Sequence, residues 1–579
     1  MPTEEPPGLT GDPGYARFAP RHVSRVELSC PDQVRSDVRP LVQPVRPAPF
    51  ATGPLQRFAA LPLTGCLDLV EFDGRSQEES AAELRSAQGR LTSWWARSHP
   101  THIEWTQQQL GSFLAARTAE QEEATAAGLP ATLPVRDHWV RRTARRPQPD
   151  ARGFSQYEHT VPGRRYASAC GRLRDVWLVS TSCSDVERGD AEKAAMAWVA
   201  AEGAPSAKPR WNKASPPTES KASVAPERVR VFAYGCRDAS YRQVLDWDAE
   251  TCARRFAAHA LPAFEQAAGT SGTRPGGSCV DCKSAGACGS LPLAPQLWGG
   301  TAPAARRPRM SLSAWDLRVY EQCPARYHLT RTLRLGSRQP ESEATRRGRA
   351  VDAWLNSAHE ARRPEGCRHA PLPRDPEHWT GGEHALSGQS ARDGAAMLDQ
   401  HRSVCPLDRL PAQERVLTQH QVSAYAPEID VVVIATPDLL YTRSGGWWWR
   451  ETKTSATGLW EGRSLMSAYP QLALGVLLLS AGVLGGELRR SRVEFELLGT
   501  GDSTLERLDP GRPAVVEEAR EVIAALAQPL LHDTTYAASP GRSCLDCEVR
   551  PWCAEGAVGP VTTSAATPVT TPQEASLAH

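Results

Sequence analysis

The chain has 579 residues, of which 67 are lysine or arginine and 66 are acidic, so its formal net charge is only +1. This balance excludes a strongly basic nucleic-acid-binding protein, and any surface for an anion must be local. The length predicts about two to four domains. No run of about 18 apolar residues is present, and residues 1–14 lack the basic and apolar parts of a secretion signal. We therefore expect a cytoplasmic protein without a membrane partner.

The first half of the chain predicts one α/β domain. Residues 1–20 are rich in proline and glycine and are expected to be disordered. The domain is predicted over residues 21–289, with a polar linker or surface loop at 203–226. Its clearest predicted elements are helices at 76–97, 107–126 and 249–268 and strands at 174–180 and 229–235. It ends in the motif SCVDCKSAGAC, which contains Cys279, Cys282 and Cys288.

The second half predicts another α/β domain. A linker is expected at 290–309, the domain at 310–554 and a disordered tail at 555–579. The predicted elements are helices at 311–327, 344–362, 466–481 and 513–531, loops at 363–413, strands between 415 and 454, and a strand at 492–498. The motif SCLDCEVRPWC closes this domain with Cys544, Cys547 and Cys553.

A hairpin at residues 436–455, TPDLLYTRSGGWWWRETKTS, carries the strongest chemical signal. The chain has only six lysines, so an ammonium at Lys453 stands out against arginine as the usual cation. Glu451 and Lys453 are two residues apart and therefore lie on one face of a strand. The Gly-Gly turn reverses the chain and can bring Asp438 beside them. Two carboxylates and an ammonium can hold a divalent cation and activate a water.

The order Pro-Asp, then 12 residues, then Glu-x-Lys resembles the core of the PD-(D/E)XK nuclease superfamily, in particular its RecB-like branch. This resemblance implies a restriction-endonuclease-like α/β fold, with a central mixed sheet flanked by helices. It also implies that Asp438 and Glu451 bind Mg²⁺ or Mn²⁺ and that Lys453 positions the attacking water.

Further positions of the family pattern can be compared one by one. A helix that usually reads G-x-x-x-H has Gly348 and then Asp352, so Asp352 becomes the third expected metal ligand. We interpret His359 as a surface residue. The helix after the hairpin provides Gln471, which the resemblance implies contacts Lys453 or a DNA phosphate. Gly475 stands where a tyrosine often occurs in the family.

The 15 cysteines are clustered, which in a reducing cytosol indicates metal ligands. Cys323, which precedes a proline, and the trio that closes the second domain resemble the ligands of the iron–sulfur RecB-like nucleases. The resemblance implies a [4Fe–4S] cluster held by four residues, Cys323, Cys544, Cys547 and Cys553. Zinc is the alternative at these cysteines.

The motif C-x₂-C-x₅-C occurs twice, which suggests a duplication with a degenerate N-terminal copy. In that copy Asp175 can be aligned with Glu451, but no lysine follows it. The first trio, Cys279, Cys282 and Cys288, is a second candidate metal or cluster site. Its fourth ligand stays open between Cys30, Cys252 and none.

These features predict a Mg²⁺- or Mn²⁺-dependent DNA nuclease that acts in repair, recombination or defence. Residues 306–349 contain 11 arginines and four acidic residues, a local excess of cations suited to phosphates. Trp448 could stack on a base, although packing against a helix is favoured. A helicase or another repair or defence protein is an expected partner, because the chain has no phosphate-binding loop of its own. The alternatives are a non-catalytic DNA- or protein-binding module with a structural cluster or zinc site, and a redox sensor.

Overall fold

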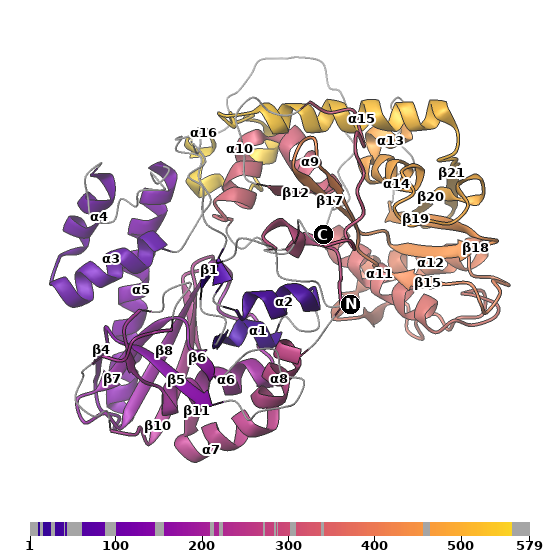
Figure 1. Ribbon diagram of the computed structural model, residues 1–579. Coiled ribbons are helices and arrows are strands. Elements are labelled where there is room, and N and C mark those ends of the chain that lie inside the picture. Colours follow the sequence, from indigo (N-terminus) through magenta and orange to yellow (C-terminus); the bar gives the residue numbers. More distant parts are fainter. Residues whose placement is uncertain are drawn as a thin grey trace.

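Figure 1 shows the computed structural model of the chain as two α/β units, the first formed by the elements up to α8 and the second by those from β12 onward. The structure describes residues 10–11, 15–24, 29–39, 41–42, 61–86, 100–144, 156–208, 214–218, 224–269, 272–282, 285, 288–301, 309–336, 341–455 and 464–557. The predicted disorder at 1–20 and 555–579 lies mostly outside these residues. The prediction of disorder is wrong for residues 15–18, because they form a strand in which Ala16 and Phe18 are fully buried.

Two sheets organise the N-terminal unit. The larger has the order β11-β10-β8-β7-β4 and contains β4 (Thr132–Pro134), β7 (Arg164–Ser168), β8 (Leu173–Ser180), β10 (Arg228–Gly235) and β11 (Ser240–Asp248). The smaller has the order β2-β6-β5-β9 and contains β2 (Tyr15–Phe18), β5 (His138–Ala144), β6 (Gln156–Thr160) and β9 (Ala204–Ser206). A short pair, β1 (Thr10–Gly11) and β3 (Leu41–Val42), lies apart from them.

Helices pack against both sheets of this unit. They are α1 (Pro20–Ser24), α2 (Pro31–Asp37), α3 (Leu61–Asp73), α4 (Gln77–Arg85), α5 (Pro100–Ala126), α6 (Asp190–Glu202), α7 (Ala249–Arg255) and α8 (Leu261–Gly269), with a π-helical turn at Phe256–Ala260. Helix α6 is alanine-rich and buried over residues 194–201, because small side chains let it approach both sheets closely. Phe113 of α5 packs edge-on against Trp177 and Tyr234 of the larger sheet.

The C-terminal unit is built around a sheet of order β15-β18-β19-β20-β21. Its strands are β15 (Val416–Thr418), β18 (Leu439–Arg443), β19 (Gly446–Thr454), β20 (Arg492–Leu498) and β21 (Ser503–Leu508). A second sheet, β12-β17-β16, contains β12 (Met310–Leu312), β16 (Val422–Ala426) and β17 (Val431–Ala435). The hairpin β13 (His378–Gly381) and β14 (His384–Ser387) completes the strands.

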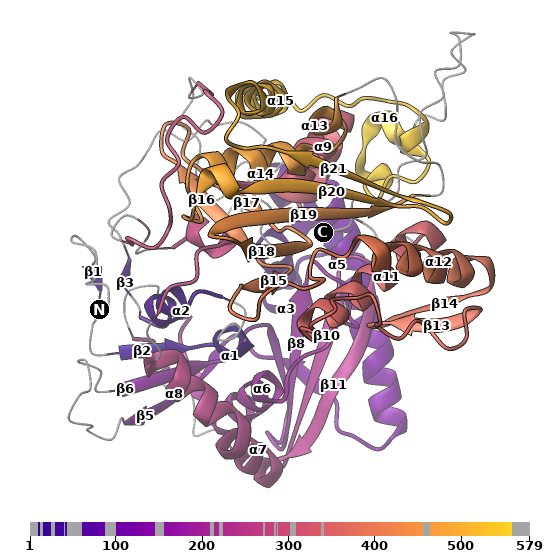
Figure 2. The same cartoon turned by 90° about the vertical axis from the view of Figure 1, so that its right-hand side faces the viewer.

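Helices cover the two faces of the main sheet, as Figure 2 shows with α14 and α15 on one side and α11 and α12 toward the other. The helices are α9 (Ala314–Gln322), α10 (Pro324–Tyr327), α11 (Glu343–Glu360), α12 (Gly388–Val404), α13 (Leu465–Ala468), α14 (Pro470–Ser480), α15 (Pro513–His532) and α16 (Ala554–Ala557). Helix α14 is buried almost throughout because it lies between the sheet and α15. This position explains its uninterrupted apolar sequence.

The main sheets of the two units share one topology. In each, the first three strands are antiparallel, the next pair is parallel (β8 with β10, β19 with β20) and the last pair is antiparallel. The units also share a hydrophobic cluster, in which Leu329, Leu333 and Leu335 pack with Trp177 and Phe232. The C-terminal unit therefore rests directly on the larger N-terminal sheet.

Two sequence predictions for the second half need correction. The segment 363–413, predicted as loops, contains the hairpin β13–β14 and the 17-residue helix α12. Its glycine, serine and arginine content hid the helical spacing of the buried Ala391, Gly394 and Leu398. In addition, the described part of the predicted linker, 290–301, packs into the C-terminal core through Ala294, Leu297 and Trp298.

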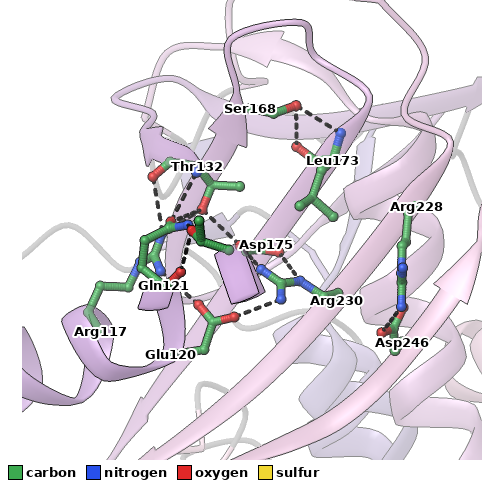
Figure 3. A network of polar contacts seen from close by, with 11 residues as sticks. Arg117, Glu120, Gln121, Thr132, Ser168, Leu173, Asp175, Arg228, Arg230 and Asp246 are labelled. Carbon is green, nitrogen blue, oxygen red and sulfur yellow. Dashed lines mark hydrogen bonds and ion pairs between the residues drawn. The ribbon is translucent and has the colours of Figure 1, made fainter. Parts of the chain in front are cut away.

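Asp175 of β8, which sequence alignment placed opposite Glu451, is part of a buried ion-pair network (Figure 3). Arg230 of β10 donates two hydrogen bonds to its carboxylate, at 2.8 and 2.7 Å, and a third to Glu120 of α5 at 2.6 Å. Thr132 donates to the same carboxylate at 2.9 Å. All oxygens of Asp175 are thus engaged by protein groups, which gives this residue a structural role.

His159 provides a pH test of the N-terminal core. Its ring is buried among Phe18, Trp198, Phe256 and Phe264, and burial lowers its pKa to about 3. In the unfolded chain His159 takes up a proton below about pH 6.5, whereas in the folded chain it stays neutral down to about pH 3. The free energy of unfolding therefore falls as the pH drops from about 6.5 to about 3. We expect His159→Phe to remove about 2 kcal/mol of the stability loss between about pH 7 and pH 5. Urea unfolding at each pH measures this difference.

His378→Ala, at an exposed histidine, is the matched control and should leave the pH dependence of the wild type unchanged. If the free energy of unfolding changed with pH by the same amount in wild type and His159→Phe, the assigned role of His159 would be contradicted.

Candidate active site and cysteine clusters

The predicted hairpin is formed by β18 and β19, which are joined by Ser444–Gly445. Both turn residues have positive φ, 53° and 84°, as in a two-residue type I′ turn. The register pairs Leu439 with Arg450. The next position on each strand therefore brings Asp438 beside Glu451, as the sequence predicts.

Lys453 lies between two carboxylates at this end of β19. Its Nζ is 3.7 Å from Oδ2 of Asp438 and 3.8 Å from Oε2 of Glu451. The backbone N–H of Thr452 donates to the same Asp438 oxygen at 2.7 Å and so fixes that carboxylate. The side chain of Lys453 is 26% exposed whereas that of Glu451 is only 5% exposed. Solvent therefore reaches this group from the side of the ammonium.

Asp352 of α11 joins the group through Gln419, a residue that sequence reasoning missed. Nε2 of Gln419 lies 3.2 Å from both oxygens of Asp352 and 3.2 Å from Oδ1 of Asp438. Helix α11 approaches β19 at Gly348, where a Cβ would lie 3.4 Å from Oγ1 of Thr454. The glycine one turn before Asp352 thus lets the helix come close to the strand.

Repulsion and burial shift the pKa values of this group. Burial, followed by the charge of Asp438, raises the pKa of Asp352 to about 7 and that of Glu451 to about 8. Burial lowers the pKa of Lys453, but its attraction to Asp438 and Glu451 outweighs burial and the net shift is upward. Lys453 is therefore a cation at neutral pH. One ammonium does not balance three carboxylates, so the group has a surplus of negative charge when all of them are ionised.

The donors of this group fit a divalent cation of the Mg²⁺ or Mn²⁺ type, because all of them are oxygens of carboxylates. The carboxylate oxygens of Asp352, Asp438 and Glu451 are not all within 4.8 Å of one another. Gln419 and Lys453 bridge them instead, as hydrogen-bond and ion-pair partners. A cation held by these oxygens would neutralise the charge that Lys453 balances only in part.

The face of β19 that carries Glu451 packs against α14. Nε1 of Trp449 donates to Oε1 of Glu451 at 2.9 Å. A Cβ on Gly475 would lie 3.1 Å from the Trp449 ring, so the indole occupies the space where the family pattern has a tyrosine. Gln471 is the second residue of the same helix, and its buried Oε1 has no hydrogen-bond partner among the described residues.

The opposite face of β19 carries a buried salt bridge. Arg450 is 1% exposed and lies 2.8 Å from Glu494 and 3.2 Å from Glu496, both of β20. Despite burial, attraction to His401 and Arg450 lowers the pKa of Glu496 to about 2. Oε2 of Glu496 also accepts from Oγ1 of Thr452 at 3.1 Å. This network therefore supports the strand position whose backbone N–H holds Asp438.

The structure brings the two parts of the C-terminal cysteine set to one place. Cys323 caps α10 at its N-terminus. Arg326, three residues later on that helix, forms a 3.0 Å ion pair with Glu548, the residue that follows Cys547. Burial raises the pKa of Cys547, and the thiol of Cys323 is near enough to add to that shift. The sulfur of Cys323 accepts the backbone N–H of Ser539 at 3.4 Å.

The N-terminal set has the same construction. Cys30 caps α2 at its N-terminus, and its sulfur accepts the backbone N–H of Arg274 at 3.4 Å. Cys30 lines one pocket together with the whole first trio, Cys279, Cys282 and Cys288. Cys252, the other candidate for a fourth ligand, lies in the hydrophobic core of the N-terminal unit.

Most of the arginines that the structure describes in residues 306–349 are paired with acidic residues of the protein. Seven of these arginines make ion pairs with acidic residues: Arg309, Arg318, Arg326, Arg331, Arg346, Arg347 and Arg349. The other part of the expected nucleic-acid interface, Trp448, stacks on Tyr441 with a ring separation of 5.8 Å. The sequence analysis favoured packing against a helix over base stacking, and in the structure Trp448 lies beside Tyr441 in a hydrophobic cluster that also includes Trp354 of α11.

The prediction of His359 as a surface residue is wrong. It is 3% exposed, and its Nε2 lies 3.2 Å from Nε2 of His401. His401 belongs to α12, the helix that the sequence analysis did not find. The signal that could have revealed this contact is the spacing of His401 and Cys405, one helical turn apart on one face.

Residues 311–554 match the family model of the PD-(D/E)XK nuclease superfamily. No curated protein matches the chain. The match covers the C-terminal unit and includes the hairpin, α11 and the second cysteine trio. Among the helices that the structure describes, none has the length and apolar character needed to span a bilayer.

Arg450 offers a stability test of the network behind the site. Arg450→Ala removes the buried cation that Glu494 and Glu496 share, and we expect a loss of about 3–5 kcal/mol in the free energy of unfolding. Arg507→Ala is the matched control, because Arg507 contacts the same Glu494 at 3.0 Å but is 55% exposed. It should cost at most about 1 kcal/mol. Equal losses in urea unfolding would contradict the burial argument.

Proposed function

We propose that the chain is a metal-dependent DNA nuclease whose active site is the group around Lys453. The observation that carries this proposal is the convergence of Asp352, Asp438 and Glu451 on one ammonium, in the unit that matches the nuclease superfamily. Superfamily members of this kind use a divalent metal to cleave phosphodiester bonds. The surplus of negative charge at this site is what such an ion would neutralise.

Each residue has a role that follows from its position. Asp352, Asp438 and Glu451 would hold Mg²⁺ or Mn²⁺, which when bound supplies a Lewis acid for the scissile phosphate. Lys453 stays protonated, so it orients the attacking water and stabilises charge on a phosphoryl oxygen by hydrogen bonding. Gln471 has a buried, unsatisfied oxygen that can accept a hydrogen bond from a positioned water. Trp449 and Thr452 hold Glu451 and Asp438 in place.

We also propose that Cys323, Cys544, Cys547 and Cys553 hold a [4Fe–4S] cluster. Their four sulfurs are not all within 4.8 Å of one another, whereas four thiolates around one zinc ion would be about 3.8 Å apart. The wider spacing favours a cluster of several atoms. Backbone N–H groups of Ser539 and Gly541 donate to Cys323 and Cys544, both at 3.4 Å, and such bonds stabilise cluster thiolates.

The same argument supports a second cluster at Cys279, Cys282 and Cys288, with Cys30 as its fourth ligand. The N–H groups that reach its sulfurs come from Arg274 and Gly276, at positions that correspond to Ser539 and Gly541 in the other loop. Both loops form a short 3₁₀ helix at the first cysteine of the trio. Zinc at either set is the alternative that metal analysis tests.

The shared sheet topology supports a duplication with a degenerate N-terminal copy. If Leu498 of β20 corresponds to Gly235 of β10, the strand registers align Glu451 with Trp177 and Asp438 with Arg164. In this alignment neither position carries an acid, whereas the sequence alignment places Asp175 opposite Glu451. The N-terminal unit would then act as a scaffold.

A role in repair, recombination or defence, with a helicase or similar protein as partner, is the biological setting that we propose. The alternatives are a non-catalytic binding module and a redox sensor. Three carboxylates gathered around one lysine, with Glu451 buried, reduce the stability of the fold, and such groups are concentrated at functional sites, which favours catalysis over a binding module.

Nuclease activity on end-labelled single- and double-stranded DNA tests this function directly. We expect Mg²⁺- or Mn²⁺-dependent cleavage, reduced at least about 100-fold in kcat by Lys453→Ala through loss of charge stabilisation. Lys193→Ala removes one of the other lysines, on α6, and should leave activity unchanged. Binding of DNA without cleavage by the wild type would instead support the binding-module alternative.

Iron analysis of protein purified without oxygen tests the clusters. We expect about eight irons per chain, with about four lost in Cys544→Ser/Cys547→Ser and about four in Cys282→Ser/Cys288→Ser. Cys236→Ser, at a buried thiol outside both sets, should retain all of them. A colourless protein with zinc at these cysteines would contradict the iron–sulfur assignment.

A further inference from the structure

Four metal-ligating side chains converge in the interior of the C-terminal unit, beside the candidate active site and separate from both cysteine sets. We call them the His₂Cys₂ group, and they are His359, Cys367, His401 and Cys405. All four are at most 8% exposed. Their ligand atoms lie within 4.8 Å of one another, and no other group of described residues meets this criterion.

The known distances in this group fit a tetrahedral ion site. The Nε2 atoms of His359 and His401 are 3.2 Å apart. Two nitrogens bound to one zinc at about 2.0–2.1 Å would be about 3.3–3.4 Å apart in a tetrahedron. Two nitrogens and two sulfurs form a donor set that suits Zn²⁺ and not Mg²⁺ or Ca²⁺, which prefer oxygen.

Groups around the four ligands already have the orientation that metal binding requires. Nδ1 of His401 lies 2.7 Å from Oε1 of Glu496, so its other nitrogen, Nε2, points to His359 and to the centre of the group. This carboxylate–histidine pair is typical of zinc sites. The backbone N–H of Cys367 donates to the sulfur of Cys405 at 3.3 Å, which stabilises that sulfur as a thiolate.

We propose that the His₂Cys₂ group binds one structural Zn²⁺ ion. Binding requires two thiolates and two neutral imidazoles, so the protons that Cys367, Cys405 and His401 hold without the ion are released to solvent, and no electron transfer is involved. All four coordination positions are filled by protein, so the ion would have no open position for a substrate. The site is therefore a structural site and is independent of the proposed nuclease chemistry.

The ion would fix the helix that carries a catalytic residue. His359 follows Asp352 by seven residues on α11, which is about two helical turns and places both on one face. His401 lies on α12, Cys405 directly follows the end of α12, and Cys367 lies in the segment between α11 and the hairpin β13–β14. Zn²⁺ would therefore set the position of α11 relative to α12 and β20, and with it the distance from Asp352 to the end of β19.

Metal analysis of the full chain, purified without oxygen, tests the proposal. We expect about one zinc per chain, lost in Cys367→Ser/Cys405→Ser with no change in iron content. Cys66→Ser/Cys236→Ser is the matched control, because both thiols are buried and lie outside every ligand set, and it should keep the zinc. Equal zinc in wild type and the Cys367/Cys405 variant would overturn the proposal, and so would a Cys367–Cys405 disulfide found by peptide mass spectrometry.

X-ray absorption at the zinc edge gives a test that does not depend on a variant lacking a ligand. The wild type should show about two sulfurs at about 2.3 Å and two nitrogens at about 2.0–2.1 Å. His359→Cys keeps four donors, so it should keep the zinc and raise the sulfur count to about three. A wild-type shell of four sulfurs, or a sulfur count that does not rise in His359→Cys, would place the zinc elsewhere and overturn the proposal.

Discussion

The alternation of side chains along β19 is the constraint on which the C-terminal unit depends. Odd-numbered residues, from Trp447 to Lys453, face α14, while Arg450 and Thr452 face α12 and the carboxylates of β20. One nine-residue strand thus places the proposed catalytic group and a buried ion network on opposite sides of the same backbone. A shift of register by one residue would exchange the two environments and bury every charge in the wrong place.

Thr452 connects the two sides of the sheet. Its side chain bonds Glu496 and its backbone N–H bonds Asp438, so the salt bridge behind the strand and the carboxylate in front of it share one residue. Glu496 in turn contacts His401. The position of Asp438 is therefore set by contacts that extend through β20 to α12, well outside its immediate surroundings.

The sequence was sufficient to predict an element where the contacts that determine it are between residues close in the chain. The hairpin follows from its turn residues and from the two-residue spacing of Glu451 and Lys453, and α11 follows from a clear helical pattern. Gln419 could not be predicted because its partner Asp352 is 67 residues away. His359 was misplaced for the same reason, since its partner lies on α12, whose polar composition concealed it. The fold class needed only composition and order, whereas these side-chain contacts needed the tertiary structure.

The scarcity of lysine has a practical consequence for the study of this protein. Lys453 is the sole lysine after residue 283, so the whole C-terminal unit contains a single primary amine. Reductive methylation with a carbon-13 reagent would place one labelled group on its Nζ, 3.7 Å from Asp438. The resonance of that methyl group would report the charge state of the surrounding carboxylates in solution, without any engineered residue and without overlap from other labelled sites in the same unit.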